Sequence, residues 1–309
     1  MSPNEPWRTE YPFASNYLEL QPSIRMHYVD EQPSADSIAT NKSTILCVHG
    51  NPTWSFYYRS IVSHFSKTHR VVAVDHVGCG LSDKPLHYAY TLEQHTRNLI
   101  RLIDSLDLDD ITLVVHDWGG AIGLGAAVER ASRFRNLLVL NTAAFPPPYI
   151  PWRIAACRIP CIGSWAIRYL NAFARTATFM AIDRLPRLSQ NAKNGLLAPY
   201  DTPNHRIAID GFVRDIPMTK SHPTRQVLEK LEQQLTKLCQ CNIRFVWGMK
   251  DWCFTPVCME RMNQHWPNAT RRELSDVGHY VMEEAPGKVI EELANLLLNA
   301  NSSTNTSAT

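Results

Sequence analysis

The sequence has few glycines, no long apolar run and no excess of charge of one sign. Its 309 residues include 13 Gly against 20 Pro, and 31 Lys and Arg stand against 29 Asp and Glu. This balance argues against nucleic acid or an anionic membrane as a partner, because both bind strongly basic proteins. No apolar stretch reaches the roughly 18 to 20 residues that cross a bilayer, so we expect no membrane span. The scarce glycines are expected to mark specific turns.

The N-terminus also lacks the basic start and apolar core of a secretion signal. We therefore expect a cytoplasmic protein whose eight cysteines are free thiols, since a reducing compartment disfavours disulfides. No Cys or His joins the pairs Cys157/Cys161 and Cys239/Cys241 at zinc-binding spacing, so no metal is expected. The sequence has no phosphate-binding lysine loop and no dinucleotide loop after its first strands, and it therefore predicts no cofactor.

Short apolar runs alternate with helical patterns along most of the chain. Residues 17–30 predict two short strands, and the runs STILCVHG, RVVAVDH, ITLVVHD and NLLVLNTAA predict four more. Helices are expected between them at about 54–66, 91–106 and 119–130. Strands that are apolar throughout and separated by helices indicate a parallel sheet covered on both faces, which is an α/β fold. Strands at NIRFVWG and TRRELSD and a helix at about 283–299 continue the pattern.

The block between these two halves interrupts the alternation. We expect a core formed by residues 1–144 and 223–300, with a helical insertion at 145–222 and a disordered polar tail at 301–309. The insertion is predicted to be helical through about residue 200 and then polar up to His222. It is interpreted as a lid over a pocket, as a subdomain that packs on itself, or as both.

One strand end has the layout of a nucleophile elbow. The apolar run Val114-Val115-His116 turns through Asp117 directly into the helix that begins at Trp118. Such a turn lifts one side chain above the sheet and points the next backbone N–H toward the reacting centre. The alternative is that Asp117 only caps the helix, which is a common role of Asp.

A second strand ends in the turn His49-Gly50-Asn51-Pro52. In folds with a nucleophile elbow, the loop at this place supplies the second N–H of an oxyanion hole. The backbone N–H groups of Asn51 and Trp118 are therefore predicted to face the same centre. An ordinary turn is the alternative interpretation.

Two late strand ends supply an acid and a base. Asp251 follows the run NIRFVWG, and His279 follows TRRELSD. One His among twelve carries little weight, but His279 has the expected place in the order nucleophile, acid, histidine. Asp251 would hold the imidazole in the required tautomer. Asp117, Asp251 and His279 are thus predicted to form a catalytic triad.

An Asp nucleophile favours displacement at an alkyl carbon over ester hydrolysis. A Ser that attacks an alkyl carbon would leave a stable ether, whereas a carboxylate leaves an ester that activated water can cleave. Halide loss and the opening of a strained ring both fit this chemistry. The side-chain amide of Asn51 and the indole N–H of Trp118 are uncharged donors suited to a departing halide.

Five segments resemble the haloalkane dehalogenases of the α/β-hydrolase fold: HGNPTWSFYYR (49–59), DHVGCGLSDKP (75–85), VVHDWGG (114–120), WGMKDWCFTP (247–256) and VGHYVMEEAP (277–286). The resemblance implies a mostly parallel eight-stranded sheet with a helical cap. It also implies that Asp117 is the nucleophile, His279 the base and Asp251 the acid, with Asn51 and Trp118 as the halide-binding pair. Because Asn141 stands where one subfamily has its acid, the chain is similar to the third subfamily. The implied substrate is a small apolar haloalkane, cleaved with water to alcohol and halide.

Two other activities stay open at this point. HVGCGLSDKP, NTAAF and PWRIAACR are also similar to the β-lactone decarboxylases of olefin biosynthesis, which share the triad. Epoxide hydrolases share the Asp elbow but usually have Gly where Val115 stands, and they need lid tyrosines, for which Tyr149, Tyr169 and Tyr200 are available. A non-catalytic receptor of the same fold would be expected to lack a triad member.

The aromatic residues of the insertion have two alternative roles. They are predicted to line a substrate tunnel or to form the core of the lid, and the same apolar lid would support a homo-oligomer. These residues are Phe145, Trp152, Trp165, Phe173 and Phe179.

Overall fold

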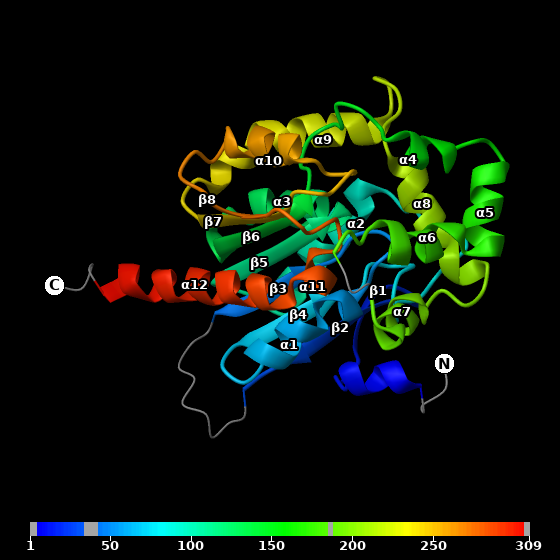
Figure 1. Ribbon diagram of the computed structural model, residues 1–309. Helices are drawn as coiled ribbons and strands as arrows, with labels where there is room; N and C mark the ends of the chain where they lie inside the picture. Colours follow the sequence, from blue (N-terminus) through cyan, green and yellow to red (C-terminus); the bar gives the residue numbers. More distant parts are fainter. Residues whose placement is uncertain (1–4, 34–42, 185–187, 306–309) are drawn as a thin grey trace.

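A computed structural model describes residues 5–33, 43–184 and 188–305 of the chain. A twisted sheet of eight strands forms its centre (Figure 1). The strands lie in the order β1-β2-β4-β3-β5-β6-β7-β8. Their bounds are β1 Asn16–Gln21, β2 Ile24–Glu31, β3 Thr44–Val48, β4 Arg70–Val74, β5 Ile111–Asp117, β6 Phe134–Thr142, β7 Asn242–Gly248 and β8 Thr270–Leu274.

Most of the strands run in the same direction, and β2 runs opposite to both of its neighbours. The pairs β1·β2 and β2·β4 are antiparallel, and every other neighbouring pair is parallel. Successive residues of a strand bury opposite faces of the sheet: Ile45 and Cys47 join one hydrophobic core, whereas Leu46 and Val48 join the other. This double burial explains the unbroken apolar runs and confirms the predicted parallel sheet.

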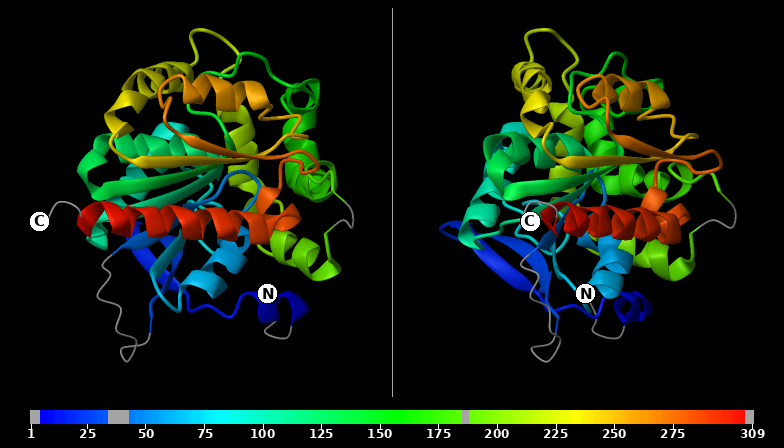
Figure 2. Two further views of the ribbon diagram at one scale, coloured as in Figure 1. Left: turned by 60° about the vertical axis from the view of Figure 1, so that its left-hand side comes forward. Right: turned by 90° about the vertical axis from the view of Figure 1, so that its left-hand side faces the viewer.

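Helices cover both faces of this sheet (Figures 1 and 2). The helices α1 (Arg59–Phe65), α11 (Val281–Glu284) and α12 (Pro286–Asn305) cover one face. The helices α2 (Leu92–Ser105), α3 (Trp118–Glu129), α9 (Pro223–Gln234) and α10 (Pro256–Asn263) cover the other. Short 3-10 helices are η1 (Pro6–Glu10), η2 (Ser55–Tyr58), η3 (Ala131–Arg133), η4 (Asn204–Arg206) and η5 (Leu235–Leu238).

In the described residues between β6 and α9, five α-helices gather at one end of the sheet (Figure 1). They are α4 (Trp152–Ala156), α5 (Ile162–Leu170), α6 (Ala172–Met180), α7 (Gln190–Leu197) and α8 (Ile207–Asp215). The last of them differs from the polar stretch expected after residue 200. Ala208, Ile209, Phe212 and Val213 are buried in this helix, at the i, i+1, i+4, i+5 spacing of one helical face.

The C-terminal region also differs from its prediction. The single helix expected at 283–299 is divided into α11 and α12, because Pro286 cannot continue the first helix but suits the start of the second. The backbone of α12 continues to Asn305, into the segment predicted as a disordered tail. Residues 306–309 of that segment lie outside the described residues.

Candidate active site

Asp117 lies at the turn between β5 and α3, with φ of 52° and ψ of −131°. This strained conformation is the one that an elbow requires, and it directs the side chain away from the helix axis. The carboxylate makes no capping hydrogen bond to α3, so the cap interpretation does not describe it. A Cβ on Gly50 would lie 2.0 Å from Oδ1 of Asp117, so only Gly leaves room for the carboxylate there.

The loop after β3 turns a backbone donor onto this carboxylate. The backbone N–H of Asn51 donates to Oδ1 of Asp117 at 2.6 Å, and the N–H of Trp118 also stabilises the charged form. His76 holds the loop from behind, because its backbone N–H donates to Nε2 of His49 and its Nε2 bonds the carbonyl oxygen of His49 at 2.9 Å. The two predicted backbone donors therefore meet at Asp117.

The structure also brings the predicted acid and base to Asp117. Nε2 of His279 lies 3.6 Å from Oδ2 of Asp117, and its Nδ1 lies 2.8 Å from Oδ2 of Asp251. The other oxygen of Asp251 accepts the backbone N–H groups of Cys253 and Phe254. Together these contacts hold the imidazole of His279 between the carboxylates of Asp117 and Asp251.

Burial and neighbouring charges shift the pKa values of Asp117 and His279. Burial raises the pKa of Asp117, and the nearby His279 and the two backbone donors offset only part of that increase. Burial lowers the pKa of His279, but Asp251 and Asp117 outweigh it, so the net pKa of His279 is raised. The two carboxylates thus favour the protonated form of His279, and burial favours the protonated form of Asp117.

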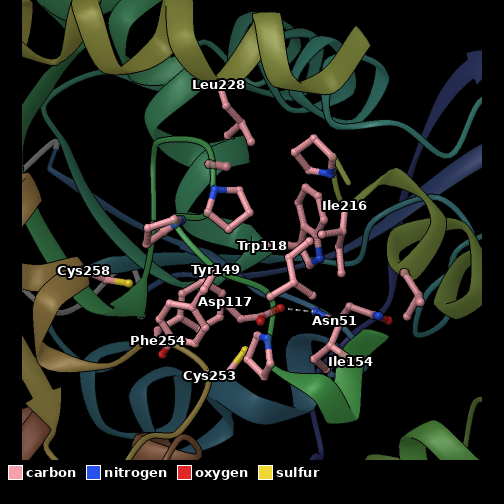
Figure 3. A pocket seen from close by; sticks show the side chains of 18 of the residues that line it. Asn51, Asp117, Trp118, Tyr149, Ile154, Ile216, Leu228, Cys253, Phe254 and Cys258 are labelled. Atoms are coloured by element: carbon pink, nitrogen blue, oxygen red, sulfur yellow. Dashed lines mark hydrogen bonds between the residues drawn. The ribbon is translucent and has the colours of Figure 1, made fainter. Parts of the chain in front are cut away.

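Two cavities meet at Asp117. The smaller cavity, of about 120 Å³, extends past Trp118 and the loop after β6 toward Leu228 of α9 (Figure 3). The larger cavity, of about 270 Å³, extends between α4, α5 and α6. The residues that line both cavities are Asn51, Asp117, Ile154, Phe173 and Cys253.

Both cavities are predominantly apolar. Among the described residues that line the smaller cavity, Asp117 is the only carboxylate, and most of the others are aliphatic, Pro or aromatic. The larger cavity adds only Arg153 and His279 as charged or readily protonated side chains. Asn51 and Trp118 line the smaller cavity beside Asp117, and the amide of Asn51 is oriented by a 3.4 Å bond to the carbonyl of Ile209.

The structure places the five aromatic residues of the insertion in different environments. Phe145 and Phe173 line the cavities. Trp152, Trp165 and Phe179 are exposed, so they fit neither the predicted tunnel nor the predicted lid core. Side-chain hydrophobicity alone could not distinguish these three positions.

The tyrosines required for epoxide opening are mostly used elsewhere. The hydroxyl of Tyr200 donates to the carbonyl of Thr53, and the side chain of Tyr169 is exposed. Tyr149 alone of the three lines a cavity. Asn141 is engaged with both backbone groups of Gly248, so it supports the end of the sheet and not His279.

Three supporting residues were not predicted. Nε2 of His116 donates to the carbonyl oxygen of His279 at 2.8 Å, and the ring centroids of these residues lie 4.4 Å apart. Glu284 accepts the backbone N–H of Gly278 and those of residues 183 and 184 of the insertion. His76 holds the loop of Asn51. The adjacency of His116 to Asp117 was the one signal available in the sequence.

The sequence also led to expectations about the cysteines, a metal site and a membrane-spanning helix. All eight cysteines are free, as predicted. Within the described ranges, no group of three or more His, Cys, Asp or Glu is placed to hold a metal ion. No helix in the described part of the chain is long and apolar enough to cross a membrane.

Comparison with known proteins places this chain in a family. Residues 43–286 match the α/β-hydrolase fold family. The chain is 35% identical to a cis-3-alkyl-4-alkyloxetan-2-one decarboxylase of Shewanella oneidensis, over 94% of this chain and 90% of that protein. It is 35% identical to the decarboxylase of the same name from Xanthomonas campestris, over 89% and 92%. It is 31% identical to haloalkane dehalogenase 2 of Mycobacterium tuberculosis, over 90% and 93%.

Solved structures show the same relationship. A mutant of haloalkane dehalogenase DatA from Agrobacterium tumefaciens superposes with a TM-score of 0.79 at 25% identity, covering 92% of this chain and 96% of that one. The haloalkane dehalogenase DpaA from Paraglaciecola agarilytica, described as tetrameric, has a TM-score of 0.75 at 26% identity, covering 92% of each chain. The chain therefore belongs to the α/β-hydrolase fold family, among the relatives of haloalkane dehalogenases and cis-3-alkyl-4-alkyloxetan-2-one decarboxylases.

Proposed function

We propose that this protein opens and decarboxylates a β-lactone that carries an alkyl chain on each of two ring carbons. The observation that carries the proposal is the pair of apolar cavities that meet at Asp117. A ring placed at this junction would extend one chain into each cavity. A small haloalkane needs only the junction itself. The 35% identity to two decarboxylases of this substrate class supports the same choice over the 31% identity to a dehalogenase.

In the first step, Asp117 attacks C4 of the ring, the alkyl-substituted carbon that is bonded to the ring oxygen. Its carboxylate oxygen forms a new C–O bond, and the bond between that carbon and the ring oxygen breaks, so the ring oxygen departs as part of a carboxylate. The side-chain donors of Asn51 and Trp118 line the cavity where this charge develops. Relief of ring strain and the raised basicity of Asp117 both favour the attack.

In the second step, the ester intermediate fragments. The bond to the new carboxylate breaks and its electron pair forms the C=C bond, while the bond to Asp117 breaks and returns the carboxylate to the enzyme. Carbon dioxide and an alkene leave, and no water is consumed. Because the attack inverts the carbon, the enzyme oxygen and the departing carboxylate are anti to one another, so a cis lactone gives a cis alkene.

The surroundings of Asp117 fit its role as a leaving group. The backbone N–H of Asn51, that of Trp118 and the cationic form of His279 all stabilise the carboxylate that the second step releases. Apart from the uncharged donors of Asn51 and Trp118, the cavity walls around the substrate carboxylate are largely apolar, so it is less solvated than in water, which favours the loss of carbon dioxide.

We also assign the domain roles on this basis. The core formed by 1–144 and 223–300 carries the triad, and the cap, residues 145–222, encloses the alkyl chains. Cap residues such as Ile154 and Phe173 line both cavities beside Asp117, which supports this division.

Haloalkane dehalogenase activity is the second candidate. The side-chain donors of Asn51 and Trp118 beside Asp117 favour it, because they would hold a departing halide as well as a departing carboxylate. In that reaction His279 takes a proton from water, and the water cleaves the ester on Asp117.

One assay compares the two activities directly. The purified protein is given a long-chain cis-3-alkyl-4-alkyloxetan-2-one in one arm and 1-bromobutane and 1,2-dibromoethane in another. We expect cis alkene from the lactone, detected by gas chromatography, at a rate well above any halide release. Halide release without alkene formation would reject the decarboxylase and leave the dehalogenase.

A further inference from the structure

The outer surface of the cap carries unusually exposed large apolar side chains. Trp152 of α4 is 75% exposed, and Ile162, Trp165 and Tyr169 of α5 are 63%, 53% and 60% exposed. We call the exposed side of α4, α5 and α6 the outer cap surface. Clustered apolar residues of this size on a soluble protein mark an interaction surface.

Helix α5 shows that this exposure is not a by-product of packing. Gly163 and Ile167 are buried, so that side of the helix already packs against the rest of the protein. Ile162, Trp165 and Tyr169 follow the i, i+3, i+7 spacing of a second stripe, which faces outward. Figure 1 shows α5 at the outer edge of the molecule, away from the sheet. A helix that is apolar on both sides is expected to have a partner on each side.

The charge of the same segment is of one sign. Residues 145–182 contain four Arg and no Asp or Glu, although the whole chain has a net charge of only +2. Arg153 and Arg175 are exposed, and the guanidinium of Arg153 lies 5.6 Å from the ring centroid of Trp152. Arg and Trp placed together at an apolar surface suit the headgroup region of an anionic bilayer.

We propose that the outer cap surface docks on an anionic lipid bilayer. Its Trp and Tyr side chains enter the headgroup region, and its Arg residues pair with lipid phosphates. The balanced charge of the whole sequence concealed this local excess. A second copy of the chain is disfavoured as the occupant, because the excess of Arg would repel an identical surface.

The larger cavity connects this surface with the active site. Ile162 and Arg153 are exposed and also line that cavity, which reaches Asp117 and His279. Docking would place its opening on the bilayer, where a lactone with two alkyl chains is dissolved. Only this last step rests on the proposed function; the docking itself is measured without substrate.

Vesicle binding tests the proposal. Purified protein is sedimented with vesicles of phosphatidylcholine alone and with vesicles that contain about one third phosphatidylglycerol. We expect binding to the anionic vesicles and a blue shift of Trp fluorescence. Trp165→Glu with Tyr169→Glu should weaken binding by at least tenfold, and Arg175→Gln by roughly fivefold. None of these three residues lines either of the two cavities that meet at Asp117.

The control variant introduces a Glu at an exposed apolar position outside the outer cap surface, and it is compared with Trp165→Glu alone as well as with the double variant. Leu298→Glu on α12, where the side chain is 66% exposed, should bind as the wild type does. Equal melting temperatures of all variants show that they fold. Failure of the wild type to bind anionic vesicles would overturn the proposal. So would a wild-type dimer in sedimentation velocity that Trp165→Glu dissociates, because that outcome assigns the surface to self-association.

Discussion

At the scale of single residues, the position of Asp117 at the end of β5 brings its carboxylate to the backbone N–H of Asn51 and to the imidazole of His279. The sequence predicted its elbow, its two backbone donors and the acid and histidine that the structure places next to it. Asn51, Asp117 and Asp251 each follow a largely apolar strand, whereas His279 follows the polar strand β8 and was predicted from its order in the chain. It did not predict the role of His116, since adjacency to Asp117 places the ring near the site but does not show that it supports the His279 carbonyl.

His279 would have a different role in each of the two candidate reactions. The ester must be cleaved by activated water in the dehalogenase reaction but fragments without water in the decarboxylase reaction. We therefore expect His279→Gln to slow alkene formation only about 10- to 100-fold, through loss of the cation beside Asp117. Bromoalkane turnover should stop with an alkylated enzyme, visible as added intact mass. Alkene formation that is lost entirely, with lactone bound to the protein, would assign His279 an obligatory role as base.

At the scale of elements, Glu284 of α11 ties the His279 loop to the cap. Its oxygens accept N–H groups from Gly278, Asp183 and Arg184. In Glu284→Gln an amide NH₂ must face at least one of these donors, so the loop is expected to shift. We expect kcat to fall about tenfold with little change in KM.

The control for this clamp is Glu291→Gln on α12, where the carboxylate pairs with Lys288 at the surface. It should leave both kinetic constants unchanged. An equal loss in the two variants, or a change in KM alone, would show that Glu284 does not position His279.

The two cavities predict how the enzyme selects for the length of each alkyl chain of the lactone. Ala166 of α5 lines only the larger cavity, and Ala143 after β6 lines only the smaller one. Ala166→Phe should lower kcat/KM at least tenfold for a lactone with its long chain at one of the two alkyl-bearing ring carbons. Ala143→Phe should lower it by a similar factor for a lactone with its long chain at the other ring carbon. Matched lactones with one short chain measure this selectivity. Identical effects of both variants on every lactone would contradict the assignment of one chain to each cavity.

The sequence predicted elements of the sheet better than elements of the cap. A strand buried on both faces leaves an unbroken apolar run, and Asn51, Asp117 and Asp251 follow such runs directly. The cap helices have apolar residues on faces that point inward and outward alike, so their pattern cannot tell Phe173, which lines both cavities, from Trp165, which is exposed.

At the scale of the whole molecule, buried histidines link stability to pH. Burial lowers the pKa of His95 to about 3, and burial with neighbouring histidines also lowers the pKa values of His76 and His116. Both ring nitrogens of His95 are buried without a hydrogen-bond partner in the described structure. Each such ring folds in its neutral form.

The sign of the pH effect follows from linkage. Below the unfolded pKa of about 6.5, the unfolded chain binds protons that the folded chain does not, so the free energy of unfolding falls as the pH drops. For His95 the loss is roughly 2 kcal/mol at about pH 5. We expect His95→Phe to reduce the difference between unfolding free energies at about pH 8 and pH 5 by that amount. The exposed substitution His87→Phe is the control, and an unchanged difference in His95→Phe would reject the account.

In the proposed reaction, Asp117 is alkylated and then released without water. Multiple turnover of a cis-dialkyl β-lactone in H₂¹⁸O, followed by mass spectrometry of the peptide that contains Asp117, tests this directly. We predict cis alkene and an unlabelled Asp117, because fragmentation returns the original carboxylate oxygens. Asp117→Asn, which tolerates the positive φ, should form no alkene. A β-hydroxy acid product with ¹⁸O in Asp117, or alkene from the Asp117→Asn protein, would contradict the account.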